Sequence, residues 1–231
     1  MLAIIPSRGG SKRIPKKNLR KFLGKPLIHW TVEAARKAKS IERVILSTDD
    51  EEIARACNTL DVEVPFLRPS ELAQDDSMAI DNYLYTIEKL AEIAREDIEE
   101  FVVLHPTSPL RLPEDIDKAV EIFRKQNADS VISCVEVSHS PDWLFNLSNT
   151  GAILRAHSVP TKNLMNSPRQ KSYLPNGAVF VFQYELLREK YSYYSSKTFP
   201  YIMPAERSVD IDTFFDFEQA ELLLAKNQVQ T

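Results

Sequence analysis

The chain has 231 residues, of which 43% are hydrophobic and 27% are charged, a composition that fits a globular protein with a substantial core. Its formal net charge of −4 argues against wholesale nucleic-acid binding. Its two cysteines, Cys57 and Cys134, have no spacing that indicates a disulfide framework or a zinc site. The apolar start Met1–Pro6 lacks the basic region of a signal peptide, and no apolar run is long enough to cross a bilayer, so we expect a cytoplasmic protein without a membrane partner.

Short apolar segments alternate with amphipathic helical patterns as far as residue 135. Strands are expected at Leu2–Pro6, Arg43–Ser47, Phe101–Leu104 and Ser130–Val135. Between them, apolar residues recur with the helical period in three sets: Leu27, Trp30, Ala34 and Ala38; Ile80, Leu84, Ile87, Ala91 and Ala94; and Ile116, Ala119, Val120 and Phe123. This alternation predicts an α/β fold in which a mostly parallel sheet carries helices on both faces. Ligands of such sheets bind beyond the carboxyl ends of the strands.

The alternation stops at about His139. Residues 139–175 are polar and aperiodic, and a stretch of about 35 residues without regular structure inside a domain usually carries a function. We therefore expect a single domain over residues 1–231 with an inserted arm at residues 139–175. Regular structure resumes with a strand at Gly177–Phe182 and closes with a helix from about Thr213 to Lys226.

A basic loop directly follows the first expected strand. The segment Ser7–Asn18 holds two of the chain's five glycines, and its basic residues are Arg8, Lys12, Arg13, Lys16 and Lys17. Glycines let backbone N–H groups approach phosphate oxygens, and Lys and Arg neutralise the phosphate charge, so the loop suits a polyphosphate. Its spacing matches neither the Walker A motif nor the dinucleotide motif GxGxxG. On composition alone, a solvated basic loop explains the segment equally well.

Three further segments each carry a functional and a plain structural interpretation. Pro106–Arg111 follows a buried strand, where a substrate loop belongs, but it also suits a turn into the next helix. Asn176 precedes Gly177, and Asn-Gly is a common turn. Asp49 is expected to cap a helix at Glu51–Ala56 rather than to act in catalysis.

Two aspartates lie two residues apart shortly before the last expected helix. In extended backbone, Asp210 and Asp212 project to the same side and can share one divalent cation. Mg²⁺ suits them, because it accepts one or two carboxylates together with phosphate oxygens and water. Alternatively, Asp212 or Thr213 is the N-cap of the last helix, with Asp216 favouring its first turn. The two interpretations are compatible.

The basic loop resembles the signature of the acylneuraminate cytidylyltransferase family, Ala-Arg-x-x-Ser-Lys-Gly-x-Pro-x-Lys-Asn, with Ser7 in place of the alanine and Arg13 in place of the glycine. The similarity continues, in family order, through Ser47–Asp49, Arg68–Ala73, Pro106–Arg111, Pro175–Gly177 and Asp210–Thr213. Each block alone is a weak signal, but together they cover nearly the whole chain.

What the resemblance implies is a Rossmann-like nucleotidyltransferase whose arm makes a homodimer. The family transfers CMP from CTP to the C2 hydroxyl of a nonulosonic acid such as N-acetylneuraminate. The reaction releases pyrophosphate and uses Mg²⁺, with Mn²⁺ as an alternative cofactor.

The resemblance also assigns roles to individual positions. Arg8, Ser11 and Lys12 are expected to hold the CTP phosphates, Lys17 and Asn18 to complete the nucleotide pocket, and Arg68 to contact the cytidine part. Ser77 is expected to add a hydroxyl to the nucleotide site. Asp210 and Asp212 are the expected metal ligands, and the expected catalytic residues are Lys12, Lys17, Asp210 and Asp212. The expected sugar-binding residues are His105, Thr107, Ser108, Trp143, Arg169 and Asn176, with Arg169 reaching the partner subunit's site.

Two positions depart from the sialic-acid branch of the family where it faces its sugar. His105 stands in place of a glutamine, and Trp143 in place of a lysine. The exchange removes donors suited to hydroxyls and adds apolar surface, which favours a less hydroxylated sugar of the legionaminic or pseudaminic type. Two other functions stay open at this point. One is a nucleotide-sugar-dependent glycosyltransferase, although its Asp-x-Asp metal motif normally follows a mid-chain strand. The other is a non-catalytic nucleotide-binding protein of the same fold.

Overall fold

A computed structural model describes residues 1–74, 77–139, 144–155 and 171–229. Its centre is a six-stranded sheet with the order β10-β6-β9-β5-β1-β4. Only β9 runs antiparallel to its neighbours in this sheet, so the predicted mostly parallel arrangement is confirmed. The strand bounds are β1 Leu2–Ser7, β4 Arg43–Thr48, β5 Glu100–Val103, β6 Ser130–Glu136, β9 Tyr173–Gln183 and β10 Thr198–Met203.

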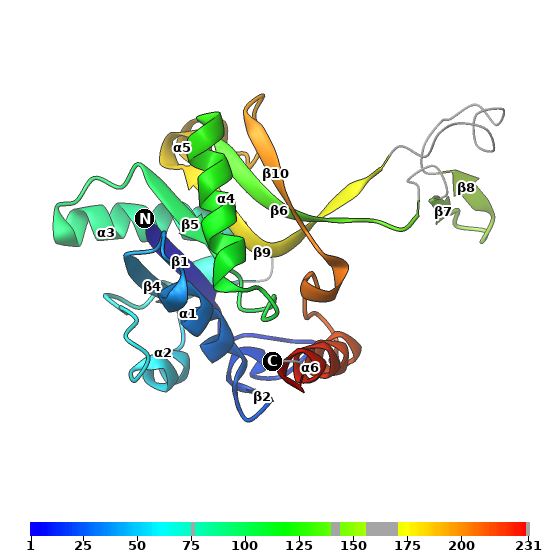
Figure 1. Ribbon diagram of the computed structural model, residues 1–231, viewed down its shortest axis with the longest axis horizontal. Coiled ribbons are helices and arrows are strands. Elements are labelled where there is room, and N and C mark those ends of the chain that lie inside the picture. Colours follow the sequence, from blue (N-terminus) through cyan, green and yellow to red (C-terminus); the bar gives the residue numbers. More distant parts are fainter. Residues whose placement is uncertain (75–76, 140–143, 156–170, 230–231) are drawn as a thin grey trace.

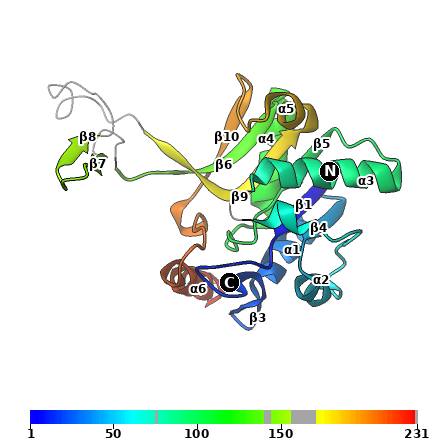
Figure 2. The same cartoon turned by 180° about the vertical axis from the view of Figure 1, so that it is seen from behind.

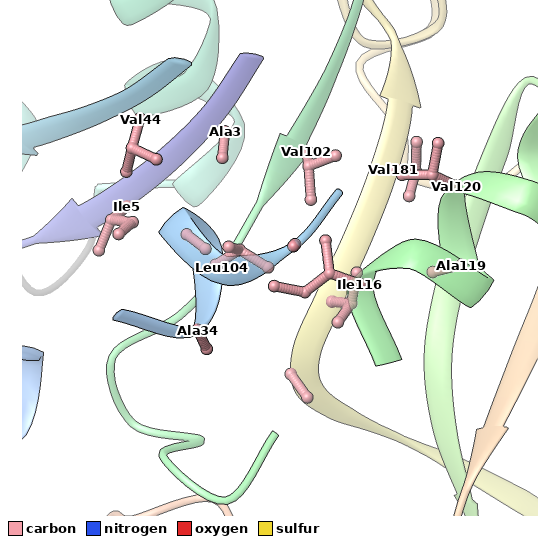
Figure 3. Close-up of a cluster of buried hydrophobic side chains, with 14 of the residues drawn as sticks. Ala3, Ile5, Ala34, Val44, Val102, Leu104, Ile116, Ala119, Val120 and Val181 are labelled. Atoms are coloured by element: carbon pink, nitrogen blue, oxygen red, sulfur yellow. The ribbon is translucent and has the colours of Figure 1, made fainter. Parts of the chain in front are cut away.

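Helices cover both faces of the sheet, as the alternating pattern predicts (Figures 1 and 2). The bounds are α1 Leu27–Lys37, α2 Glu51–Cys57 and α4 Pro113–Gln126 on one face, and α3 Ala79–Ala94 and α5 Tyr184–Lys190 on the other. Successive side chains of β1 point to opposite faces, so Ala3 and Ile5 pack with α1, α2 and α4, whereas Leu2 and Ile4 pack with α3 and α5. Figure 3 shows part of the first core, where Val102 of β5 and Leu104 lie near Ile116 of α4.

The buried face of α3 differs from the prediction. Ile80 and Ile87 are buried as expected, but Tyr83 and Leu90 complete the face, and Ala94 is exposed. Tyr83 turns inward because its ring stacks on Phe182 of β9, with 6.4 Å between the ring centroids. Compared with the predicted face, the buried face of α3 is therefore shifted around the helix towards Tyr83.

A third, smaller core lies beside the loop that follows β1. Helix α6 (Phe214–Val229) buries Phe217 and Ala220 against Phe22 of the short hairpin made by β2 (Lys21–Phe22) and β3 (Lys25–Pro26). This packing brings the segment before α6 to the carboxyl ends of β1 and β5. Residues 8–20 and 205–213 therefore meet in space, although they lie far apart in the sequence (Figure 1).

The predicted insertion extends away from the sheet. Strands β6 and β9 continue beyond it as a two-stranded ribbon, which leads to a small hairpin of β7 (Phe145–Leu147) and β8 (Ile153–Arg155) (Figure 1). The sequence pattern did not predict this hairpin, because strands of three residues are too short for a period-two signal. The described part of the chain has no helix that is long and apolar enough to cross a bilayer.

The cap of α2 is one residue away from its predicted position. The carboxylate of Asp50, not Asp49, accepts hydrogen bonds from the backbone N–H groups of Glu52 and Ile53, at 2.7 and 3.3 Å. Strand β4 runs on through Thr48, so Asp49 occupies the turn and faces the loop after β1 instead. The expectation that Asp49 is a helix cap was wrong.

Candidate active site

A cavity of about 490 Å³ opens at the carboxyl ends of β1 and β5. One wall is the basic loop, a second is the segment after β5, and Asp212 stands at the edge before α6. This is where an α/β sheet normally binds its ligand. The lining residues are Pro6, Arg8, Ser11, Lys12, Arg13, Ile14, Lys17, Asn18, His105, Pro106, Thr107 and Asp212.

Close packing fixes the path of the basic loop. The backbone N–H of Gly9 donates to Asp49 Oδ1 at 3.1 Å. A Cβ atom at Gly9 would lie 2.3 Å from Asp50 Oδ2, so the loop can approach α2 this closely only with glycine there. At the other end of the loop, Asn18 Nδ2 donates to the carbonyl of Arg8 at 3.2 Å. The cationic side chains between these points are thus held on a defined backbone.

Four cationic side chains, those of Arg8, Lys12, Arg13 and Lys17, line the cavity. Arg8 Nη1 donates to the carbonyl of Gln74 at 3.2 Å, and Lys17 Nζ donates to the carbonyl of Ile211 at 2.6 Å. Burial lowers the pKa of Lys17, and the charges of Asp212 and Asp210 oppose that shift. The wall is therefore strongly positive and suits an anionic ligand.

Of the residues expected to bind CTP, Asn18 lines the cavity, but Arg68 and Ser77 do not. Asn18 is buried, and its Oδ1 has no hydrogen-bond partner among the described residues. Arg68 is also buried: its Nη1 donates to the carbonyl of Ser47 at 3.3 Å, and its Nη2 lies 3.7 Å from Asp49 Oδ1. Burial lowers the pKa of Arg68. Ser77 Oγ donates to the carbonyl of Glu71 at 2.8 Å.

His105 is set in an aromatic layer behind the cavity. Its Nε2 lies 2.8 Å from the hydroxyl of Tyr83, and its ring centroid lies 5.2 Å from that of Phe180. Burial, together with the charges of Arg111 and Lys17, lowers the pKa of His105 to about 4. The imidazole is therefore neutral at neutral pH and presents one edge to the cavity.

Ser108 and Asn176 are buried in a protein network rather than on the cavity wall. Ser108 Oγ donates to the carbonyl of Asn176 at 3.1 Å, and Asn176 Oδ1 accepts from Ser133 Oγ at 2.6 Å. This network fixes Gly177, whose φ is 72°. A Cβ atom at Gly177 would lie 3.2 Å from Ser108 Oγ and 3.6 Å from Asp210 Oδ2. Trp143 and Arg169 lie outside the described residues.

Asp210 and Asp212 lie on the segment that precedes α6. Desolvation by neighbouring protein atoms raises the pKa of the Asp210 carboxylate; the charge of Asp212 adds to that rise, whereas a hydrogen bond from Thr107 and the charge of Lys17 oppose it. Asp212 Oδ2 lies 2.7 Å from Arg13 Nη1, and its Oδ1 lies 3.7 Å from Lys17 Nζ.

The start of α6 is capped by other residues. The backbone N–H of Thr213 donates to Asp216 Oδ2 at 2.7 Å, and the N–H of Asp216 donates to Thr213 Oγ1 at 3.3 Å. This reciprocal pair is a capping box. Of the two predicted caps, Thr213 is therefore the one that acts, and the carboxylate of Asp212 faces cations instead.

Three residues in or beside the site received no individual role from the sequence, although Arg111 closes the Pro106–Arg111 block. Arg13 was seen only as part of the basic loop, and Tyr83 shares a helix face with ordinary core residues. Arg111 is buried beneath the segment after β5, where it donates to Thr31 Oγ1 at 2.9 Å and to the carbonyl of His105. A buried arginine of this kind gives no signal in a single sequence, because its burial depends on tertiary contacts.

The model of a family described as cytidylyltransferase matches residues 2–229. The chain belongs to the cytidylyltransferase family. The sequence resemblance is thereby confirmed, and the chain is an enzyme of nucleotidyl transfer rather than a glycosyltransferase.

Three relatives of this cytidylyltransferase have related names. It is 34% identical to a CMP-N,N'-diacetyllegionaminic acid synthase of Legionella pneumophila, an alignment that covers 99% of this chain and 97% of the relative. It is 28% identical to a pseudaminic acid cytidylyltransferase of Campylobacter jejuni, over 98% of this chain and 97% of the relative. An N-acylneuraminate cytidylyltransferase of Streptococcus agalactiae is 35% identical over 94% of this chain, which spans 51% of that relative.

Solved structures confirm the fold of the cytidylyltransferase. It superposes with a TM-score of 0.72 on a CMP:2-keto-3-deoxy-manno-octonic acid synthetase complexed with CTP, at 17% identity over 98% of both chains. The TM-score is 0.63 for a 4-diphosphocytidyl-2C-methyl-D-erythritol synthase from Anaerococcus prevotii, at 17% identity over 97% of both chains. The predicted Rossmann-like nucleotidyltransferase fold is therefore correct.

Proposed function

We propose that this cytidylyltransferase transfers CMP from CTP to the C2 hydroxyl of a nonulosonic acid and releases pyrophosphate. The observation that carries the proposal is the cavity at the ends of β1 and β5, in which a wall of four cations faces Asp212. Legionaminic, pseudaminic and neuraminic acids, which the names of three relatives contain, are all nonulosonic acids.

Attack of a sugar hydroxyl on the α-phosphorus of CTP is an in-line displacement. Negative charge moves onto the leaving pyrophosphate, so catalysis depends on positioning and on cations next to the phosphates. Arg8, Lys12 and Lys17 are suited to this work because they line one wall on a fixed backbone. Ser11 lines the same wall and supplies a hydroxyl.

Asn18 is suited to the nucleoside part. Its buried Oδ1 has no partner in the described parts of the protein, and an amino or hydroxyl group of the nucleotide would satisfy it. We place Arg68 behind this site, where its guanidinium faces Asp49, the residue that holds the N–H of Gly9. Ser77 remains a prediction from the sequence.

Asp210 and Asp212 fit a divalent cation, Mg²⁺ or Mn²⁺. The described residues contain no group of three His, Cys, Asp or Glu side chains that could hold a metal ion. Mg²⁺ in nucleotide sites needs only one or two carboxylates, since substrate phosphates supply further ligands. A cation beside Asp210 would also offset the desolvation and the neighbouring negative charge that raise its pKa. When bound, the ion would neutralise charge on the triphosphate.

The sugar we propose is a 9-deoxy diacetamido nonulosonic acid of the legionaminic or pseudaminic type. His105 lies against Phe180, and its Nε2 is already engaged by Tyr83, so this part of the wall offers few groups to sugar hydroxyls. Thr107 lines the same wall, and Ser108 and Asn176 act behind it by fixing Gly177.

A panel of sugars tests this preference. We expect kcat/KM, measured by pyrophosphate release with CTP and Mg²⁺, to be higher for the diacetamido sugar than for N-acetylneuraminate. The ratio should stay within about a hundredfold, because an apolar pocket rejects an added hydroxyl only weakly. His105→Gln should shift the ratio towards N-acetylneuraminate. If N-acetylneuraminate is about tenfold the better substrate for the wild-type enzyme, the preference drawn from His105 is wrong.

We also propose that the enzyme is a homodimer joined through the arm. The described arm exposes a set of large apolar side chains, and a two-stranded ribbon has little stability alone in water. These residues are Leu144, Phe145, Leu147, Ile153, Leu154 and Leu174. A second copy of the chain would bury them.

A further inference from the structure

Arg13 and Asp212 join the two walls of the cavity. Arg13 Nη1 lies 2.7 Å from Asp212 Oδ2, and both residues line the cavity. The other carboxylate oxygen of Asp212 lies 3.7 Å from Lys17 Nζ. Lys17 is fixed by its hydrogen bond to the carbonyl of Ile211, and its side chain is only 13% exposed. Arg13 is the most exposed member of this group, with 68% of its side chain exposed, so few contacts hold its guanidinium in place.

The proposed function gives these two residues opposite tasks. A triphosphate in the cavity attracts the guanidinium of Arg13 and is repelled by the carboxylate of Asp212. A divalent cation needs that same carboxylate. Because the pair is largely exposed to solvent, its own strength corresponds to a factor of only about 1.5 to 5 in an equilibrium constant. Ligands that bring their own charge can therefore separate it.

We infer that Arg13 is an exchanging cation: it neutralises Asp212 while the cavity is empty, and moves to the triphosphate when a divalent cation takes Asp212. This inference rests on the proposed function. Arginine suits both partners, because its planar fork matches a carboxylate as well as a phosphate.

The test uses Arg13→Gly and two binding measurements that do not depend on turnover. Calorimetry measures CTP binding with Mg²⁺ and without sugar, and water proton relaxation measures Mn²⁺ binding without nucleotide. We expect the Kd of CTP to rise about 5- to 20-fold, because the charge-assisted contact between Arg13 and the triphosphate is lost. We expect the Kd of Mn²⁺ to fall about 1.5- to 5-fold, because Asp212 no longer has a competing partner. Opposite shifts of this kind do not follow from a structural role for Arg13.

Lys16→Gly is the matched control. Lys16 belongs to the same loop, is similarly exposed and pairs with Glu52 at 2.6 Å, but it does not line the cavity. Its φ of 51° suits glycine, so the substitution removes the same charge without strain. Both affinities should stay within about 1.5-fold of the wild type. A second variant, Arg13→Lys, keeps the charge and should give intermediate shifts of both constants.

Two results would overturn the inference. If wild-type enzyme binds CTP but Arg13→Gly moves both constants no further than the control, or in the same direction, the exchange does not occur and the proposed function stands. If the wild-type enzyme binds no CTP even with Mg²⁺, the proposed function fails and the inference fails with it.

Discussion

At the scale of single residues, Lys12 is the most direct probe of the basic wall. It is exposed at the cavity, so its side chain contributes little to folding. We expect Lys12→Ala to lower kcat/KM for CTP by about 10- to 150-fold, the equivalent of about 1.5–3 kcal/mol for a charge-assisted phosphate contact. Steady-state kinetics and thermal melting measure both effects. Lys37→Ala, an exposed lysine on α1 outside the cavity, serves as the control. Near-normal activity of folded Lys12→Ala would remove Lys12 from the site.

His105 makes stability depend on pH. Its pKa is lowered to about 4 in the folded protein from 6.5, so between these values the unfolded chain binds more protons. Stability from the neutral imidazole is complete above pH 6.5 and is lost as the pH falls towards 4. From pH 7.5 to pH 5 the loss is about 2 kcal/mol. Urea unfolding of the wild type at both pH values measures this loss of unfolding free energy. His105→Gln has no imidazole at this position, so its loss should be smaller by about the same 2 kcal/mol. Equal pH dependence in both proteins would contradict the burial of His105.

The residue scale also shows where sequence reasoning stops. The position of the basic loop directly after a strand was enough to predict that its residues share one cavity, because a loop after a parallel strand lies at the ligand-binding end of the sheet. The structure places Arg8, Ser11, Lys12, Lys17 and Asn18 there. Motif matching did not distinguish a side chain on the wall from one behind it. Arg68, Ser108 and Asn176 are buried by segments that are distant in sequence, so their depth depends on tertiary packing.

At the scale of elements, the segment before α6 allows metal binding and helix capping to be tested separately, because different residues serve the two roles. Asp210→Asn and Asp212→Asn keep the shape of the side chains and remove their charge, so each should lower the Mg²⁺-dependent rate by orders of magnitude. Stability of Asp212→Asn should change by less than about 0.5 kcal/mol, because Thr213 and Asp216 cap the helix.

Thr213→Ala is the complementary variant. It removes the hydroxyl that accepts from the N–H of Asp216 and should cost about 0.5–2 kcal/mol of unfolding free energy. Its carboxylates remain, so Mg²⁺ dependence should be close to that of the wild type. Denaturation measures the free energy of unfolding of Thr213→Ala and Asp212→Asn, and titration with Mg²⁺ measures how the rate of each variant depends on the metal. A destabilised Asp212→Asn with a normal metal response would return Asp212 to the role of a cap.

Strands that consist of a buried apolar run were predicted, whereas β10, in which buried and exposed residues alternate after Pro200, and the hairpin of β7 and β8 were not. Strands β1, β4, β5, β6 and β9 were found because each carries a run of apolar residues bounded by polar ones. The hairpin of β7 and β8 was missed, since strands of three residues are too short to give a recognisable period-two pattern. The N-cap of α2 was placed one residue early because Asp49 and Asp50 are equally good capping residues.

At the scale of the whole molecule, the arm should control assembly. We expect a dimer at micromolar concentration in analytical ultracentrifugation, and a monomer for the double variant Phe145→Asp and Leu147→Asp, which places charges on exposed apolar positions of β7. Leu222→Asp is the control, because Leu222 is 64% exposed on α6, close to the 67% of Leu147, but lies outside the arm. An active wild-type monomer would contradict the proposed homodimer and also the prediction that Arg169 reaches the partner subunit's site.

The central claim is that CMP passes from CTP to a nonulosonic acid, and ³¹P NMR observes this transfer directly. Wild-type enzyme, CTP, Mg²⁺ and the diacetamido sugar should give a new phosphodiester signal and pyrophosphate in equal amounts, and neither should form without the sugar. Asp212→Asn should abolish both signals on the same time scale. A reaction that leaves CTP intact with every nonulosonic acid, or that releases phosphate without a phosphodiester, would contradict the proposed function.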